Sequence, residues 1–187
     1  VLLPDGSREV VPGSGEVGMV AQGGMVPLGY YKDPEKSAKT FKEIDGTRYA
    51  LIGDMATIDA DGTINLLGRG SNCINTGGEK VFPEEVEEAL KLHPHVADAL
   101  VFGLEDERFG NRVAGVVSLE QSGTAEAGDI LEATRKLLAS YKLPKDLLVV
   151  PVVPRAPNGK ADYKTAKSMM ADGLAHWVTP VTQRSLR

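Results

Sequence analysis

The chain has 187 residues, 42% of them hydrophobic and 25% charged, and a net charge of −5. This is the composition of a soluble globular protein with one or two small cores, and it excludes a disordered tail. The negative charge excludes an electrostatic footprint for nucleic acid, and the lack of an apolar run of roughly 18 residues or of a leader predicts a cytoplasmic protein without a transmembrane segment.

The first third of the chain is predicted to be β-rich. Short strands are expected at residues 16–21, 50–58 and 63–67, where β-branched and apolar residues lie between turn formers. The turn Asp59–Gly62 contains two aspartates but lacks the other ligands of a calcium loop, so a plain hairpin turn is expected. The chain starts at Val1 with a turn-like segment, which indicates a fragment or a processed chain.

From Gly70 onward, predicted helices alternate with predicted strands, as in a separate small α/β domain. Pro83 stands at a typical first helical position, and Glu84 and Glu85 complement the positive helix start. A helix of about ten residues is therefore expected there. Strands are expected at residues 97–103, 112–119 and 147–153.

Two further helices are predicted in this domain. Asp129 is the expected N-cap of the first, and the second is expected to run from about Asp162 to Gly173. The apolar side of the first of these helices is expected to consist of Ile130, Thr134, Leu137, Leu138 and Tyr141. Residues 174–187 show no clear period, so an irregular tail is expected there.

Two motifs are typical of ligand sites only in a different context. Gly13–Gly18 spells G-x-G-x-x-G, but dinucleotide binding needs a helix after that motif, and a strand-like run follows here. His93 and His95 have no carboxylate or cysteine partner in their segment, so they are interpreted as capping residues. With one cysteine, Cys73, no internal disulfide can form, and no metal site is predicted.

Three other features are compatible with a phosphate-bearing ligand, and each also has a plain structural interpretation. The segment Pro154–Lys160 contains two prolines and an Asn-Gly pair, so it is a stiff turn that presents a point cation, or an ordinary surface lysine. Gly77–Gly78 allows the close approach of a thin ligand, or simply makes a tight turn. Asp54 has two acceptor oxygens for two ribose hydroxyls.

Taken in order, these segments resemble the adenylate-forming enzyme superfamily, and nearly the whole chain up to about residue 171 takes part. Gly77–Glu79 and Tyr141–Lys145 are most similar to acyl-CoA synthetases for fatty or sterol-derived acids. The other matching segments are Gly15–Val17, Gly29–Tyr30, Pro34–Glu35, Tyr49–Asp54, Gly68–Arg69, Pro83–Glu87 and Pro154–Lys160.

The resemblance implies an α+β fold. Residues 1–69 would be the end of a large N-terminal domain, as a β-rich, distorted barrel-like segment, and residues 70–72 would be a hinge. Residues 73–173 would form a mobile α/β domain with a mixed sheet and about three helices, followed by an irregular tail at residues 174–187.

The resemblance also implies an AMP-forming acid–thiol ligase. In that reaction a carboxylate attacks the α-phosphate of ATP to give an acyl-adenylate, and CoA then displaces AMP. Lys160 would be catalytic and would bind ATP or AMP together with Asp54 and Arg69, while Asn72 would be the hinge residue. The residues implied in CoA binding are Gly77, Gly78, Glu79, Lys80 and Lys142. ATP, CoA and Mg²⁺ are the implied cofactors, with the Mg²⁺ site outside this chain, and the implied partner is the protein's own N-terminal domain.

Two departures from the family pattern bear on these roles. Ile52 stands where the family usually has threonine, and Asn72 stands where the hinge residue is commonly aspartate. The second change should alter the energetics of the hinge rather than the chemistry, because asparagine also adopts unusual backbone angles.

Other functions stay open on these residues. An adenylation domain that loads an acid onto a carrier protein would share every motif, and a non-catalytic nucleotide-binding or interaction fragment is a further alternative. The acyl pocket and the phosphate loop are expected upstream of Val1, so neither the acid nor a homo-oligomeric state is defined by this sequence.

Overall fold

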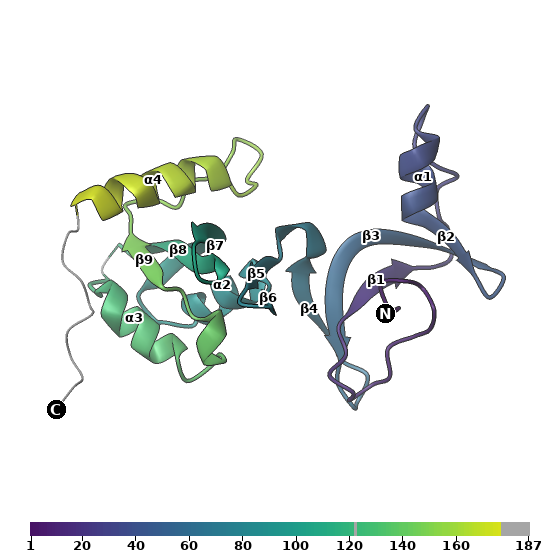
Figure 1. Ribbon diagram of the computed structural model, residues 1–187, viewed down its shortest axis with the longest axis horizontal. Helices are drawn as coiled ribbons and strands as arrows, with labels where there is room; N and C mark the ends of the chain where they lie inside the picture. The colour runs from purple at the N-terminus through teal and green to yellow at the C-terminus, as the bar shows by residue number, and fades with distance from the viewer. Residues whose placement is uncertain (122, 177–187) are drawn as a thin grey trace. The chain divides into compact units, whose positions relative to one another are not determined.

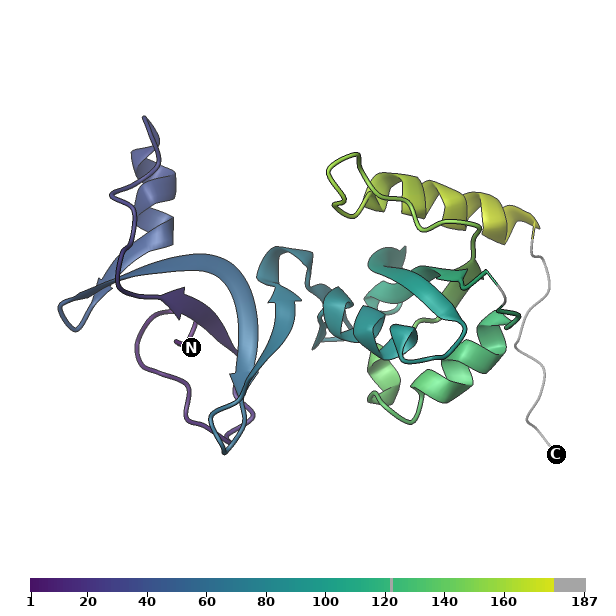
Figure 2. The same ribbon diagram turned by 180° about the vertical axis from the view of Figure 1, so that it is seen from behind.

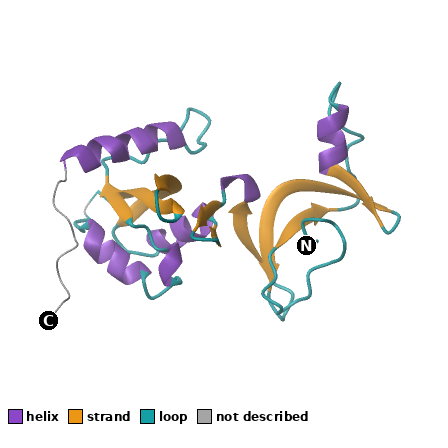
Figure 3. Ribbon diagram, viewed as in Figure 1, coloured by secondary structure: helices purple, strands orange, loops and turns teal. Residues whose placement is uncertain are grey.

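The computed structural model describes residues 1–121 and 123–176. The chain divides into two compact units, Val1–Cys73 and a second that begins at Ile74. Figure 3 shows that the first is built mainly of strands and that the second combines a sheet with helices. This confirms the predicted fold class, a β-rich segment followed by a small α/β domain. No helix in the described residues is long and apolar enough to cross a membrane.

The first unit is organised around β3 (Thr47–Ile58), a long strand that curves strongly in Figure 1. One edge of β3 pairs with β1 (Gly18–Gln22). The opposite edge pairs with β2 (Phe41–Ile44) near its start and with β4 (Ile64–Arg69) near its end. Because β1, β2 and β4 each pair only with β3, the sheet is open, and these strands form no closed barrel.

The predicted strands of this unit correspond to β1, β3 and β4, with boundaries that differ by a few residues. The turn Asp59–Gly62 is a hairpin turn as predicted, since the Asp59 N–H donates to the Thr63 carbonyl at 2.9 Å. The segment Gly13–Gly18 leads into strand β1, so the helix that a dinucleotide site needs is replaced by a strand. Helix α1 (Pro34–Thr40) and strand β2 were not predicted.

The second unit contains a five-stranded mixed sheet. Strand β8 is central: it pairs antiparallel with the edge strand β7 in a long hairpin, it pairs parallel with β9, and the small β5–β6 hairpin joins it at Gly110. The strands are β5 (Ile74–Thr76), β6 (Glu79–Val81), β7 (Val96–Asp106), β8 (Gly110–Leu119) and β9 (Asp146–Val149).

Helices cover both faces of this sheet, as Figure 1 and the reverse view in Figure 2 show. The first core cluster joins the sheet to α2 (Pro83–Lys91) and α3 (Ala127–Thr134) through Val86, Leu90 and Ile130. The second joins the opposite face to α4 (Tyr163–His176) through Ala166 and Met170. Strand β7 serves both clusters because alternate side chains point to opposite faces.

The start of α2 at Pro83 is confirmed, but the prediction for the next helix is partly wrong. Helix α3 has Glu126, not Asp129, at its N-cap position, and it ends at Thr134. Its end is tightened by a bond from the Leu137 N–H to the Thr134 carbonyl three residues back, at 2.9 Å. Leu137 and Tyr141 therefore lie outside the helix and are exposed.

Two further boundaries differ from the predictions. The strand expected at residues 147–153 ends at Val149, two residues before Pro151, which has no N–H to donate. Gly173 does not end α4, which continues to His176. A Cβ at Gly173 would lie 2.8 Å from Leu148 Cδ2, so this glycine permits close contact between α4 and β9. The remainder of the predicted tail, residues 177–187, lies outside the described residues.

Candidate functional site

The two nucleotide-binding candidates of the first unit are neighbours. Asp54 on β3 lies directly opposite Arg69 on β4, and the Arg69 Nε lies 3.2 Å from Asp54 Oδ1. The Asp54 side chain is 28% exposed and that of Arg69 is 58% exposed. A half-buried carboxylate with a cation at one oxygen keeps further acceptor capacity for hydroxyl groups.

Lys160 lies on a tight hairpin that precedes α4. The Ala156 N–H donates to the Lys160 carbonyl at 2.8 Å, and the Gly159 N–H donates to the Ala156 carbonyl at 2.8 Å. Gly159 has φ +79°, a left-handed conformation that favours glycine. The Asn158 side chain accepts from the Lys160 N–H at 3.1 Å, so the backbone of the lysine is fixed while its side chain is exposed.

Gly77 and Gly78 form the two-residue turn of the β5–β6 hairpin. Their φ values of +59° and +91° match the primed turns that hairpins of this length prefer. The Gly77 N–H donates to the Phe109 carbonyl at 3.0 Å, and a Cβ on Gly77 would lie 3.1 Å from the Phe109 ring. A Cβ on Gly78 would meet nothing within 4 Å, so Gly78 is the open side of the turn.

The remaining CoA-binding candidates are not all in one place. Glu79 and Lys80 follow the glycine turn on β6 and are exposed. Lys142 lies in a short 3-10 turn (Ser140–Lys142), where its Nζ lies 2.6 and 2.7 Å from the two carboxylate oxygens of Glu85. The sequence did not predict this ion pair, which uses two of the three N–H donors of the Lys142 ammonium.

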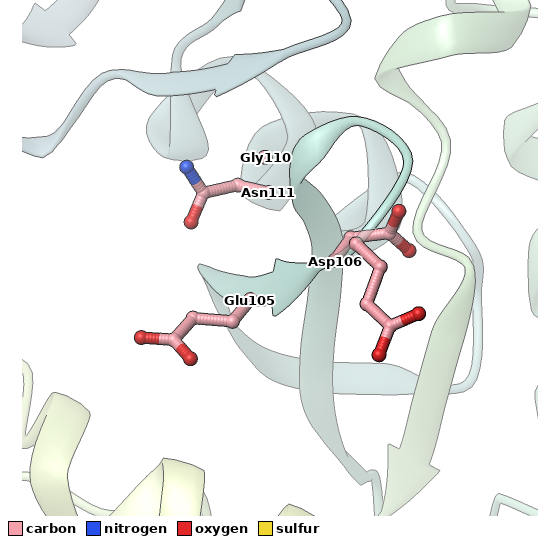
Figure 4. A pocket seen from close by; sticks show the side chains of 5 residues that line it. Glu105, Asp106, Gly110 and Asn111 are labelled. Atoms are coloured by element: carbon pink, nitrogen blue, oxygen red, sulfur yellow. The ribbon is translucent and has the colours of Figure 1, made fainter.

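A shallow hollow of about 490 Å³ lies beside the β7–β8 turn. Figure 4 shows its acidic lining, in which Asp106 also stabilises the turn by accepting the N–H groups of Arg108 and Phe109. Its carboxylates would repel a phosphate, so this hollow does not fit the nucleotide or CoA phosphates. The lining residues are Glu105, Asp106, Glu107, Gly110 and Asn111.

Asn72 lies at the end of a single 3-10 turn (Gly70–Asn72) that connects β4 to β5. Its side-chain oxygen accepts from the Ser71 hydroxyl at 3.4 Å, and the Cys73 N–H donates to the Gly70 carbonyl at 3.3 Å. Within the described residues, no group of three or more His, Cys, Asp or Glu side chains is arranged to hold a metal ion.

The chain is similar in sequence to a known domain family and to known CoA ligases. Residues 85–160 match the AMP-binding enzyme C-terminal domain family. The chain is 51% identical over 166 residues to 3-oxocholest-4-en-26-oate–CoA ligase of Rhodococcus rhodochrous, covering 89% of this chain and 30% of that protein. It is 50% identical over 169 residues to the medium/long-chain-fatty-acid–CoA/3-oxocholest-4-en-26-oate–CoA ligase of Mycolicibacterium smegmatis, covering 90% and 31%.

The fold also matches solved structures. The ATP-bound crystal structure of MatB from Rhodopseudomonas palustris aligns with a TM-score of 0.74 and 30% identity, covering 91% of this chain and 33% of that one. The chain thus spans about a third of the length of the proteins it matches. The family match over residues 85–160 and these alignments together show that the chain is similar to the C-terminal part of adenylate-forming enzymes.

Proposed function

We propose that the intact protein is an AMP-forming acyl-CoA synthetase for fatty or sterol-derived acids. The observation that carries the proposal is the identity of about half of all aligned residues with two relatives that are named CoA ligases for such acids. In this proposal, the upstream part of the protein supplies the acyl pocket and the phosphate loop, and this chain supplies the residues described above.

Asp54 and Arg69 are proposed to hold the nucleotide. The carboxylate of Asp54 accepts hydrogen bonds from the two ribose hydroxyls, and Arg69, whose Nε lies 3.2 Å from Asp54 Oδ1, orients that carboxylate. Their cross-strand pairing on β3 and β4 supports this role, because a rigid sheet fixes both side chains without a ligand.

Lys160 is proposed to act in the first half-reaction. Its ammonium would neutralise charge that develops on the carboxylate and α-phosphate oxygens as they approach. The exposed side chain on a rigid hairpin supports this role, since the cation is available and its backbone is held. Mg²⁺, when bound, would neutralise phosphate charge, and in this proposal its ligands come from the upstream part of the protein.

The glycine turn is proposed to serve the second half-reaction. Gly78 presents bare backbone to open space, which permits the pantetheine arm of CoA to pass close to the chain. Glu79, Lys80 and Lys142 remain proposed contacts of CoA. A turn about Asn72 would exchange the lysine hairpin for the glycine turn, as a hinge movement absorbed by a few backbone angles.

The proposal is tested with the intact protein, ATP, and a panel containing fatty acids and 3-oxocholest-4-en-26-oate. Pyrophosphate release and a CoA thioester are expected with at least one acid. Residues 1–187 alone should give neither product, because they span about a third of the relatives. Pyrophosphate release without any CoA thioester would instead favour loading of a carrier protein, and the absence of both products with the intact protein would contradict the proposal.

Asn72→Pro tests the hinge. Proline fixes φ near −65°, which is typical of the 3-10 turn seen here, so any step that needs another φ at this position should slow. The two half-reactions of the intact enzyme should then respond unequally when pyrophosphate release and thioester formation from premade acyl-adenylate are measured separately. Equal losses in both, or no loss, would place the hinge elsewhere.

A further inference from the structure

Arg155 ties the lysine hairpin to the sheet of the second unit. It follows Pro154 at the start of that hairpin and lies opposite Ala161 in a single β-bridge. Its Nε donates to Asp98 Oδ2 at 2.8 Å and its Nη2 donates to Asp98 Oδ1 at 2.7 Å. A bidentate bond of this kind fixes orientation as well as distance, because the guanidinium and the carboxylate are both planar.

The backbone of β7 directs Asp98 toward this partner. The pairing of β7 with β8 is irregular between Val96 and Asp98. Val96 packs in the first core cluster together with Val101, whereas Leu100 and Phe102 pack in the second cluster, beneath α4. In a regular strand Val96 and Leu100 would point to the same face of the sheet. The irregularity, like a β-bulge, therefore moves the side chains before it to the opposite face. Asp98 follows the irregularity and is two residues before Leu100, so its side chain points to the same face as Leu100, the face that α4 covers.

Asp98 is itself held firmly. Its Oδ1 accepts the Ala99 N–H at 2.8 Å, and Glu87 on α2 accepts the Val101 N–H at 2.8 Å, so carboxylates satisfy both of these donors of β7. The hydrogen bond from Arg155 holds the pKa of Asp98 below its ordinary value, against the opposing effect of burial. The same bond raises the pKa of Arg155. The pair therefore stays ionised around neutral pH.

We propose that Arg155 is a positioning residue for Lys160. This rests on the function proposed above, in which Lys160 acts in adenylation. The bonds within the hairpin fix its shape, and the Arg155–Asp98 pair fixes where that shape sits on the domain. The exposed Lys160 side chain has no ion pair within the described part of the chain, so it depends on the hairpin for its placement.

The test uses the intact enzyme and separates the two half-reactions. Arg155→Gln and Asp98→Asn should each slow pyrophosphate release about tenfold to a hundredfold, since a displacement of ~1 Å at a reacting group has an effect of this size. Thioester formation from premade acyl-adenylate should change less than about twofold, because Lys160 is not used in that step. Arg155→Lys should restore part of the rate, as it keeps the charge without the planar fork.

A double variant distinguishes positioning from a general loss of structure. If Arg155 acts through Lys160, adding Arg155→Gln to Lys160→Ala should slow adenylation by less than about twofold further. Arg112→Gln is the matched control: it breaks the 2.6 Å ion pair with Asp146 elsewhere in the sheet, so it should affect the half-reactions equally.

Three results would overturn the inference. These are equal slowing of both half-reactions by Arg155→Gln, an undiminished effect of Arg155→Gln in the Lys160→Ala background, or an unequal effect from Arg112→Gln. An intact wild-type protein that releases no pyrophosphate would overturn the proposed function itself, and the inference with it.

Discussion

Lys160→Ala in the intact enzyme is expected to slow acyl-adenylate formation by roughly a hundredfold, equivalent to about 3 kcal/mol of transition-state stabilisation. In the proposed mechanism the lysine neutralises charge that develops in that step, and it would be remote from the reaction centre once the hinge has turned. Thioester formation from premade acyl-adenylate and CoA should therefore stay near normal. Lys164→Ala, which removes an exposed lysine in the first turn of α4, is the control and should leave both rates unchanged.

Gly78→Leu should show the reverse pattern. The new side chain would point into the open space beside the glycine turn and obstruct the pantetheine arm proposed to pass there, while the Asp54–Arg69 pair proposed to bind the nucleotide stays intact. Because φ at Gly78 is +91°, strain alone must be separated from obstruction. Gly46→Leu provides that control, since Gly46 has φ +73° in an equally open hairpin turn of the first unit. If Lys160→Ala slowed both half-reactions alike, or Gly78→Leu slowed adenylation only, the proposal would be wrong that the lysine hairpin serves adenylation and the glycine turn serves CoA transfer.

Glu87→Gln is expected to stabilise the protein above neutral pH. Burial raises the pKa of Glu87 to about 7, from an ordinary value of 4.5, with Glu84 acting in the same direction. The Val101 N–H, Arg155 and Lys91 oppose the shift but do not cancel it. Between pH 4.5 and about pH 7 the folded protein keeps a proton on Glu87 that the unfolded chain has lost. The free energy of unfolding should therefore fall as pH rises through this range and level off above about pH 7.

The size of this effect is up to about 3 kcal/mol, because each pKa unit corresponds to about 1.4 kcal/mol. Glutamine keeps an acceptor for the Val101 N–H but has no charge to bury. Thermal unfolding at pH 5 and pH 8 should therefore show a midpoint several degrees higher for Glu87→Gln at pH 8 and little difference at pH 5. Glu88→Gln, on the exposed side of α2, is the control and should retain the wild-type pH dependence. An unfolding midpoint equal to that of the wild type for Glu87→Gln at pH 8 would contradict the conclusion that the buried charge of Glu87 destabilises the folded protein.

Local signals explain which elements could be predicted. Pro83 with its acidic neighbours defines the start of α2, and the turn Asp59–Gly62 defines the β3–β4 hairpin, because each signal acts within a few residues. Helix α1 carries a similar signal, with the Asp33 side chain accepting the Lys36 N–H at 2.9 Å and Pro34 at the first position. Its seven residues bury no side chain, so the periodic apolar pattern that identifies longer helices is missing.

Contacts between distant residues could not be predicted in the same way. The resemblance to the family alone implied that Lys142 binds CoA. Its ion pair with Glu85 depends on the fold, which brings together two residues that are 57 positions apart in the sequence. The same separation lies between Asp98 and Arg155, whose meeting requires a shifted strand phase that no pattern in the sequence marks. The resemblance placed Asp54 and Arg69 at one nucleotide site, and the β3–β4 register shows that they lie directly opposite each other.

Because the connection at Gly70–Asn72 is short, it has little backbone conformational entropy to lose. Gly70 packs on Met55 of β3, and Ile74 is 4% exposed in the core of the second unit, so three residues remain between two fixed points. Ordering one residue costs about 1–2 kcal/mol, so confining this connection in any one conformation costs only a few kcal/mol. A long flexible linker would lose far more. Little binding energy is therefore needed to offset the loss of backbone freedom in this connection.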